Sequence, residues 1–142
     1  MSAMKQILLI EDNPADVGLM REAMREAGLE VVLHAAENAP QAFMFLRNKL
    51  AIDLPDVIIL DLRMPVIDGL ATLKILKANA PIDAIPVVIL TSSRTTLDRT
   101  TCLRAGAACF TSKPMTIDGY VGLANALAQR LRSGFAACPS DD

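Results

Sequence analysis

Short hydrophobic runs alternate along the chain with longer segments in which apolar residues recur every three or four positions. The runs are residues 5–10, 30–35, 56–61, 85–91 and 108–111. The segments with helical spacing follow them, at residues 14–28, 38–50, 68–79, 97–105 and 116–132. Short apolar runs are typical of strands buried on both faces, and the longer period favours amphipathic helices. The pattern therefore predicts five successive β-α units.

This alternation predicts an α/β fold, because each right-handed crossover between parallel strands must lie over the sheet. We expect a three-layer αβα sandwich around a five-stranded parallel sheet. A length of 142 residues fits one domain, since domains commonly hold roughly 100 to 150 residues. We expect this domain to span residues 1–132. Residues 133–142 contain Gly, Pro, Ser and two terminal acids, which favours a C-terminal tail and no output domain.

Composition excludes several classes of function. A net charge of −2 gives no basic surface for nucleic acid. The apolar runs are far shorter than the roughly 18 residues of a membrane-spanning helix, and no signal-peptide pattern is present, so we expect a cytoplasmic protein without membrane contact. Three cysteines without CxxC spacing and a single histidine, His34, support neither a zinc site nor a disulfide framework, and we expect reduced thiols.

Polar residues that can take part in binding or reaction lie where the predicted strands end. They are Glu11 and Asp12 after the first strand, Asp61 after the third, Thr91 and Ser92 after the fourth, and Lys113 after the fifth. If the first and third strands are neighbours, three carboxylates share one cleft, and charges about 4 Å apart repel by roughly 4 kcal/mol at an effective dielectric near 20. One lysine cannot neutralise them, whereas Mg²⁺ with oxygen ligands can. The sequence therefore predicts a magnesium and phosphoryl site.

These residues resemble the receiver domain of two-component response regulators, over about residues 5–132. The resemblance rests on Glu11-Asp12, Asp61, Thr91 and Lys113-Pro114 in this order, with Met64-Pro65 and Asp68-Gly69 after Asp61. It implies the flavodoxin-like strand order 2-1-3-4-5. It also implies a phosphoacceptor switch rather than an enzyme, and leaves room for an intrinsic autodephosphorylation.

The same resemblance implies a role for each site residue. Asp61 would accept a phosphoryl group from a partner histidine kinase. Glu11, Asp12, Asp61 and the main-chain carbonyl of Arg63 would hold Mg²⁺. Arg63 stands where chemotaxis-type receivers commonly have Asn, which predicts an effect of its side chain on autodephosphorylation.

Four further residues would respond to the phosphoryl group. Lys113, the Thr91 hydroxyl and the Ser92 backbone N–H would bond its oxygens. Thr91 and Phe110 would then act as the switch that alters the face formed by the fourth helix, fifth strand and fifth helix. An aromatic residue in a buried strand is equally well explained as core, so for Phe110 both interpretations stay open.

Other interpretations of the same residues remain. Glu11 and Asp12 could simply be acids favoured by a helix dipole. A flavodoxin-like cofactor binder shares the fold, but its phosphate loop would be repelled by these two acids. A haloacid-dehalogenase-type phosphatase also uses an aspartate nucleophile with Mg²⁺, but it would want a second aspartate where Arg63 stands.

The stretch from Glu11 to Val17 resembles the single-domain regulators paired with bacterial and cyanobacterial phytochromes, which implies a bacteriophytochrome kinase as partner. Between Ile117 and Gln129 the only charged residue is Asp118. A solvated amphipathic helix should carry more charge, so we expect a homodimer through the fourth-helix, fifth-strand and fifth-helix face, helped by Phe135. Alanines tolerated at the surface would explain the same pattern.

Overall fold

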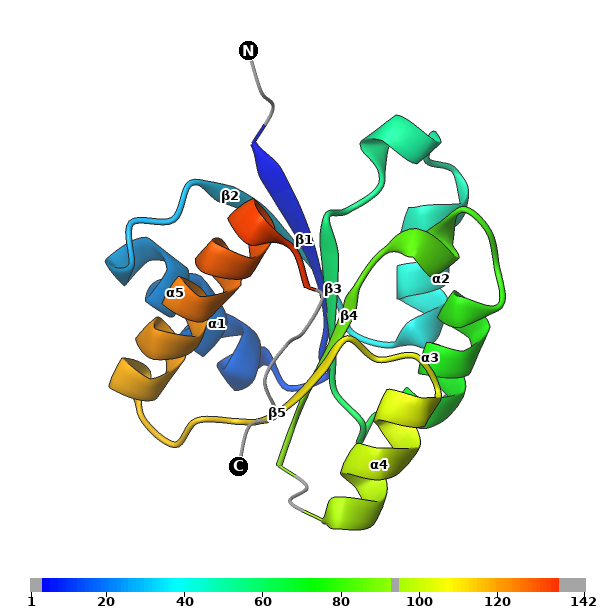
Figure 1. Ribbon diagram of the computed structural model, residues 1–142. Helices are drawn as coiled ribbons and strands as arrows, with labels where there is room; N and C mark the ends of the chain where they lie inside the picture. Colours follow the sequence, from blue (N-terminus) through cyan, green and yellow to red (C-terminus); the bar gives the residue numbers. More distant parts are fainter. Residues whose placement is uncertain (1–3, 93–94, 136–142) are drawn as a thin grey trace.

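A central sheet of five parallel strands lies between two layers of helices (Figure 1). The computed structural model describes residues 4–92 and 95–135. Its strands are β1 (Lys5–Ile10), β2 (Val31–Ala36), β3 (Val57–Leu60), β4 (Val87–Thr91) and β5 (Cys109–Ser112). Its helices are α1 (Pro14–Glu26), α2 (Ala39–Arg47), α3 (Gly69–Lys77), α4 (Thr96–Arg104) and α5 (Ile117–Ser133), with 3₁₀ turns at Ala51–Asp53 and Ile82–Ala84. The strand order β2-β1-β3-β4-β5 confirms the predicted sheet.

Alternation along the strands divides the core in two. In β3, Val57 and Ile59 pack on the side of α1 and α5, whereas Ile58 and Leu60 pack on the side of α2, α3 and α4. Successive side chains of a strand point to opposite faces, so an entirely apolar strand requires helices on both sides. This is why all four residues of β3 are buried.

Side-chain caps fix where the helices begin. The Asn13 carboxamide accepts the Ala15 N–H at 2.9 Å, and Pro14 follows it as the first residue of α1. The Asp68 carboxylate accepts the Ala71 N–H at 2.9 Å at the start of α3. A side-chain acceptor at this position satisfies a backbone donor that the helix leaves free. Each of these helices therefore starts at a residue that its cap defines.

The prediction of reduced thiols does not hold for every described cysteine. Cys109 is disulfide-bonded, whereas Cys102 is free and buried, so the expectation of reduced thiols is wrong for Cys109. The spacing rule failed because it tests only local pairs such as CxxC, and the sequence contains no such pair.

The expected tail lies mostly beyond the described residues. It begins at Ser133, which is the last residue of α5, and its residues 136–142 lie outside the part of the chain that the structure describes. Among the helices described, none has the length and apolar character needed to cross a bilayer.

The loop between β3 and α3 is tightly constrained near the strand ends. A Cβ atom on Gly69 would lie 2.4 Å from the carbonyl oxygen of Asp61 and 2.4 Å from the Cα of Leu62. The Gly69 N–H also donates to the Leu62 carbonyl at 2.9 Å. Val66 in the same loop has φ 72°, and the Ile67 N–H donates across it to the Pro65 carbonyl at 2.9 Å, which makes a strained γ-turn. The backbone carrying Asp61 is therefore held tightly by its own loop.

Replacing Gly69 with alanine should lower the free energy of unfolding by at least about 2 kcal/mol, because the new methyl group collides with backbone atoms that cannot move aside. Urea denaturation measures the change. Gly122→Ala in α5 is the matched control, since a Cβ at this position would meet no neighbouring segment within 4 Å and alanine favours a helix by about 1 kcal/mol. Equal stability of Gly69→Ala and the parent protein would contradict the close approach.

Candidate functional site

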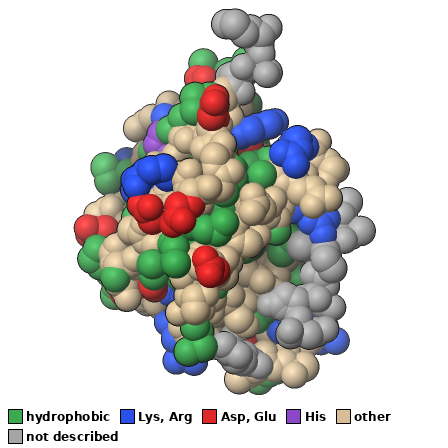
Figure 2. Space-filling view, turned by 90° about the vertical axis from the view of Figure 1, so that its left-hand side faces the viewer, with side chains coloured by type: hydrophobic (Ala, Val, Ile, Leu, Met, Phe, Trp, Pro, Cys, Tyr) green, Lys and Arg blue, Asp and Glu red, His purple; other side chains and the backbone are tan. Residues whose placement is uncertain are grey.

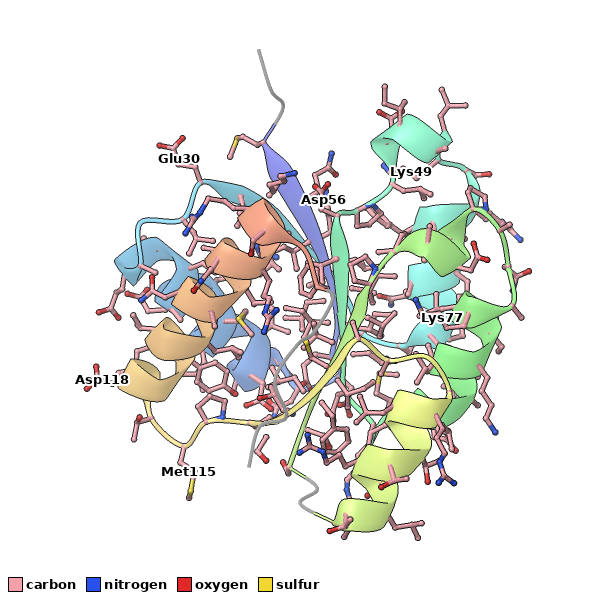
Figure 3. The ribbon with its side chains drawn as sticks, viewed as in Figure 1. Glu30, Lys49, Asp56, Lys77, Met115 and Asp118 are labelled. Atoms are coloured by element: carbon pink, nitrogen blue, oxygen red, sulfur yellow. The ribbon has the colours of Figure 1, made fainter. Side chains whose placement is uncertain are left out.

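Backbone hydrogen bonds bring the four strand ends together at one edge of the sheet. The Asp61 N–H donates to the Ile10 carbonyl at 3.2 Å, which fixes the residue after β3 beside the end of β1. The Lys113 N–H donates to the Thr91 carbonyl at 2.8 Å, which fixes the residue after β5 beside the end of β4. Parallel strands share one direction, so residues following each of them collect at the same edge. In Figure 3, Met115 marks this edge and Asp56 the opposite one.

The carboxylates that follow β1 and β3 lie close together, because these two strands are neighbours in the sheet. Glu11, Asp12 and Asp61 each place a carboxylate oxygen within 4.8 Å of the other two. Glu11 and Asp61 are buried, and Asp12 is exposed. One Asp61 oxygen accepts the Lys113 ammonium at 3.1 Å, and the other accepts the Arg63 N–H at 3.3 Å. The predicted convergence of these side chains is therefore present in the structure.

The ammonium group of Lys113 contacts three carboxylates. Lys113 Nζ lies 2.8 Å from Glu11 Oε1, 2.7 Å from Asp16 Oδ2 and 3.1 Å from Asp61 Oδ2, with 13% of its side chain exposed. Burial alone lowers the pKa of Lys113, but the hydrogen bonds that its ammonium donates to Asp16 and Glu11, together with the charge of Asp61, raise it well above the usual value. Lys113 therefore stays charged and acts as the internal counter-ion of the cluster.

The cluster keeps an excess of negative charge. Burial raises the pKa of Glu11 to about 7, and the Asp61 carboxylate contributes to this rise, while the hydrogen bond from Lys113 opposes it. The largest cause of this rise is burial, so the excess of charge follows from the number of acids: Lys113 is the one ammonium in contact with Glu11, Asp16 and Asp61 among the described residues. The donors are hard carboxylate oxygens, and one of these residues, Asp12, faces solvent. This donor set fits a divalent ion such as Mg²⁺.

The other predicted residues lie around this cluster in different environments. Thr91 is fully buried at the end of β4, and Ser92 is exposed. Arg63 is exposed, while its backbone N–H contacts Asp61. Phe110 is 6% exposed and belongs to the core on the side of α2, α3 and α4. The structure thus shows Phe110 as a core residue, and its role as a switch stays a prediction.

The sequence pattern missed Asp16. This residue lies in the first turn of α1 rather than at a strand end, yet it makes the shortest contact with Lys113. An acid in the first turn of a helix is commonly explained by the helix dipole, which hides a second role. No spacing rule finds it, because Asp12 precedes the helix cap Asn13 and the i,i+4 rule applies only within a helix.

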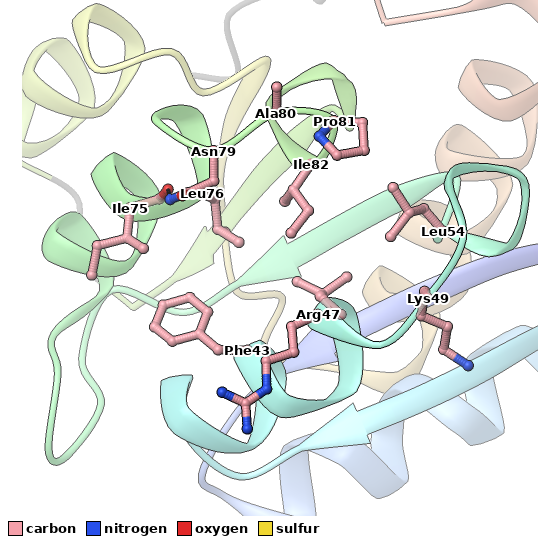
Figure 4. Close-up of a pocket in the computed structure, with 11 residues that line it drawn as sticks. Phe43, Arg47, Lys49, Leu54, Ile75, Leu76, Asn79, Ala80, Pro81 and Ile82 are labelled. Atoms are coloured by element: carbon pink, nitrogen blue, oxygen red, sulfur yellow. Dashed lines mark hydrogen bonds between the residues drawn. The ribbon is translucent and has the colours of Figure 1, made fainter.

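A pocket of about 380 Å³ lies elsewhere, between α2, α3 and the turn at Ile82–Ala84 (Figure 4). Apolar side chains such as Phe43, Leu54 and Ile82 line it, together with Arg47 and Lys49. None of the residues lining it is acidic, so it lacks the ligands that a magnesium and phosphoryl site needs.

Comparison with known proteins decides the family. Residues 7–123 match the response regulator receiver domain. This chain belongs to that family. As a receiver domain it is a signalling protein, and receiver domains take phosphoryl groups from histidine kinases.

Curated relatives agree with this assignment. The transcriptional regulatory protein TrcR of Mycobacterium tuberculosis is 30% identical over 138 residues, which cover 96% of this chain and 49% of TrcR. The chain thus spans about half the length of several curated relatives that it matches. The polar-differentiation response regulator DivK of Brucella anthropi is 26% identical over 117 residues, covering 82% of this chain and 90% of DivK.

Solved structures with the same fold include phytochrome regulators. The phosphorylated cyanobacterial phytochrome response regulator RcpA has a TM-score of 0.82 and 27% identity, covering 92% of this chain and 96% of RcpA. The Mn²⁺-bound response regulator Rcp1 has a TM-score of 0.76 and 27% identity, with coverages of 88% and 92%. The bacteriophytochrome response regulator AtBRR has a TM-score of 0.72 and 31% identity, also with coverages of 88% and 92%. This receiver domain therefore has relatives associated with phytochromes.

Substituting Lys113 with methionine should lower the free energy of unfolding by about 3 kcal/mol in a metal-free buffer, because buried carboxylates lose their counter-ion. Urea denaturation with a chelator present measures this loss. Lys5→Met is the control, since that ammonium lies 4.0 Å from Asp56 on an exposed surface and should matter by less than about 1 kcal/mol. Similar losses for the two variants would contradict the counter-ion role.

Proposed function

We propose that this receiver domain accepts a phosphoryl group on Asp61 and signals through its α4-β5-α5 face, by protein contact or phosphoryl relay. The proposal treats residues 1–132 as the receiver domain and 133–142 as a tail. The observation that carries it is the meeting of Glu11, Asp12 and Asp61 within 4.8 Å beside the Lys113 ammonium. A site for a cation and a phosphoryl group accounts for so many acids around one lysine.

The transfer follows from the position of Asp61. A carboxylate oxygen of Asp61 attacks the phosphorus of a phosphohistidine, the P–N bond breaks, and the imidazole leaves with the bonding electron pair. Lys113, the Thr91 hydroxyl and the Ser92 backbone N–H bond the phosphoryl oxygens. Phosphoryl transfer depends mainly on positioning and on neutralising charge, so these groups suffice without further covalent chemistry.

A metal ion completes this proposal. Glu11, Asp12, Asp61 and the main-chain carbonyl of Arg63 would hold Mg²⁺, which when bound neutralises charge on the transferring phosphoryl group. The Mn²⁺-bound form of Rcp1, a relative of similar fold, supports a divalent ion in this family. The excess of acids over the single lysine supports it in this chain.

The proposed partner is a sensor histidine kinase, and specifically a bacteriophytochrome. Two observations support the finer assignment: the stretch from Glu11 to Val17, and the similarity to RcpA and AtBRR. The proposed compartment is the cytoplasm. A flavodoxin-like or phosphatase role is not favoured, because Glu11 and Asp12 occupy the position of a phosphate loop and Arg63 stands where a second aspartate is needed.

Beryllofluoride, a phosphoryl analogue, should bind the parent protein in the presence of Mg²⁺ and should not bind Asp61→Asn, which lacks the charged oxygen that bonds beryllium. Fluorine NMR of the bound analogue provides the measurement. Asp53→Asn, in an exposed 3₁₀ turn, is the control and should bind like the parent. Binding to Asp61→Asn would show that another group accepts the phosphoryl moiety.

Arg63→Asn should shorten the half-life of the aspartyl phosphate at least about twofold, because a smaller side chain opens the approach of water and can orient it. The exposure of Arg63 next to the Asp61 contact supports this proposal. Decay of radiolabelled phosphoprotein gives the half-life. An unchanged half-life would remove any role of the Arg63 side chain in autodephosphorylation.

We also propose a homodimer through the α4-β5-α5 face. Leu97 and Leu103 expose apolar surface on α4 and support it, whereas Tyr120, Ala124 and Leu127 of α5 are buried within the same molecule. Light scattering should therefore give twice the monomer mass with beryllofluoride and Mg²⁺ bound, and Leu97→Lys should restore the monomer. A monomeric mass for the analogue-bound parent would contradict the dimer.

A further inference from the structure

Asp16 has a single partner among the described residues, and that partner is the lysine of the proposed phosphoryl site. Its Oδ2 accepts the Lys113 ammonium at 2.7 Å, and no other described residue hydrogen-bonds its carboxylate. Asp16 lies outside the set of carboxylates close enough to share a metal ion. It comes from helix α1, whereas the other partners of Lys113 follow strands. Asp16 therefore acts on the site only through Lys113.

A buried hydroxyl lies in the core that α1 shares with α5. Tyr120 of α5 is 2% exposed and packs in the core between the sheet, α1 and α5, which lie side by side (Figure 1). Its hydroxyl donates to no other described residue, although a buried hydroxyl without a partner is costly. Burial raises the pKa of Tyr120, and among the neighbouring charges that of Asp16 raises it most.

A phosphoryl group on Asp61 changes the partners of Lys113. Its oxygens are strong acceptors with about 1.5 to 2 negative charges, and they draw the ammonium away from its present carboxylates. Glu11 and Asp61 can then share a metal ion, but Asp16 cannot. The Asp16 carboxylate of α1 is left without its lysine partner, while the buried phenol of Tyr120, on the adjoining helix α5, has no acceptor among the described residues.

We propose that Asp16 is a positioning residue that competes with the phosphoryl group for Lys113, and that the Tyr120 hydroxyl becomes the donor to Asp16 when Lys113 turns to the phosphoryl oxygens. The inference rests on the proposed function of Asp61. It links occupation of the site to the contact between α1 and α5. Tyr120 thereby reports on, and stabilises, the phosphorylated form.

The chain contains one tyrosine and no tryptophan, so its intrinsic emission comes from Tyr120 alone. Beryllofluoride with Mg²⁺ should lower this emission in the parent, because a phenol that donates to a carboxylate is quenched. Asp16→Asn should still bind the analogue, as fluorine NMR shows, with little or no fall in emission. Glu22→Gln on the exposed surface of α1 is the matched control and should behave like the parent.

Affinities provide a second, independent measurement. Asp16→Asn should bind beryllofluoride about fivefold more tightly, because an amide competes weakly for the ammonium. Tyr120→Phe should bind it about threefold more weakly, because the released carboxylate then lacks a donor. In the Asp16→Asn background, Tyr120→Phe should have no effect, which shows that the two residues act on each other.

The outcomes separate this inference from the proposed function. If the parent fails to bind the analogue at all, the assignment of Asp61 is wrong and the inference falls with it. If the parent binds but Asp16→Asn shows the same emission change and the same affinity as the parent, the receiver function stands and the role of Asp16 is overturned. Tyr120→Phe with unchanged affinity would overturn the role of the phenol.

Discussion

The ammonium group of Lys113 is the interaction on which the site depends. It is the one cation that contacts Glu11, Asp16 and Asp61 among the described residues, and it joins the ends of β1, β3 and β5 to the start of α1. Without it, mostly buried carboxylates would face one another, and a buried charge without a partner is far more costly than an exposed one. The surrounding architecture serves to hold these groups in contact.

The sheet order explains why distant residues can share one lysine. Because β3 lies between β1 and β4, and β5 lies beside β4, the residues that follow these strands collect within a few ångströms. A shift of register in β3 would place Ile58 in the opposite layer and would move Asp61 away from Ile10, whose carbonyl accepts its N–H. Packing of the core therefore fixes the geometry of the charges. The loop around Gly69 adds a local constraint, since backbone atoms of Asp61 occupy the space of a side chain.

The sequence was sufficient for the fold and for the acids at the strand ends, because both follow from periodicity and strand direction. Asp12, Asp61 and Lys113 could be placed at one edge as soon as the elements were known. Asp16 could not, since its part depends on the path of one flexible lysine side chain and not on where a strand ends. Phe110 illustrates the same limit, because an apolar strand residue has one pattern whether it only packs or also moves. The disulfide of Cys109 is likewise not signalled by a local spacing such as CxxC.

The excess of acids over the single lysine suits the site to act as a switch. In most proteins the buried polar groups have partners, and the exceptions concentrate at functional sites. Here Glu11 is driven toward its neutral form, and Lys113 is shared among three carboxylates instead of forming one optimal pair. A cation and a phosphoryl group would relieve this conflict from outside, so the imbalance among the side chains itself favours their binding. Because Lys113 follows β5 and Asp16 belongs to α1, any change of partner reaches α1 and the segment that leads into α5.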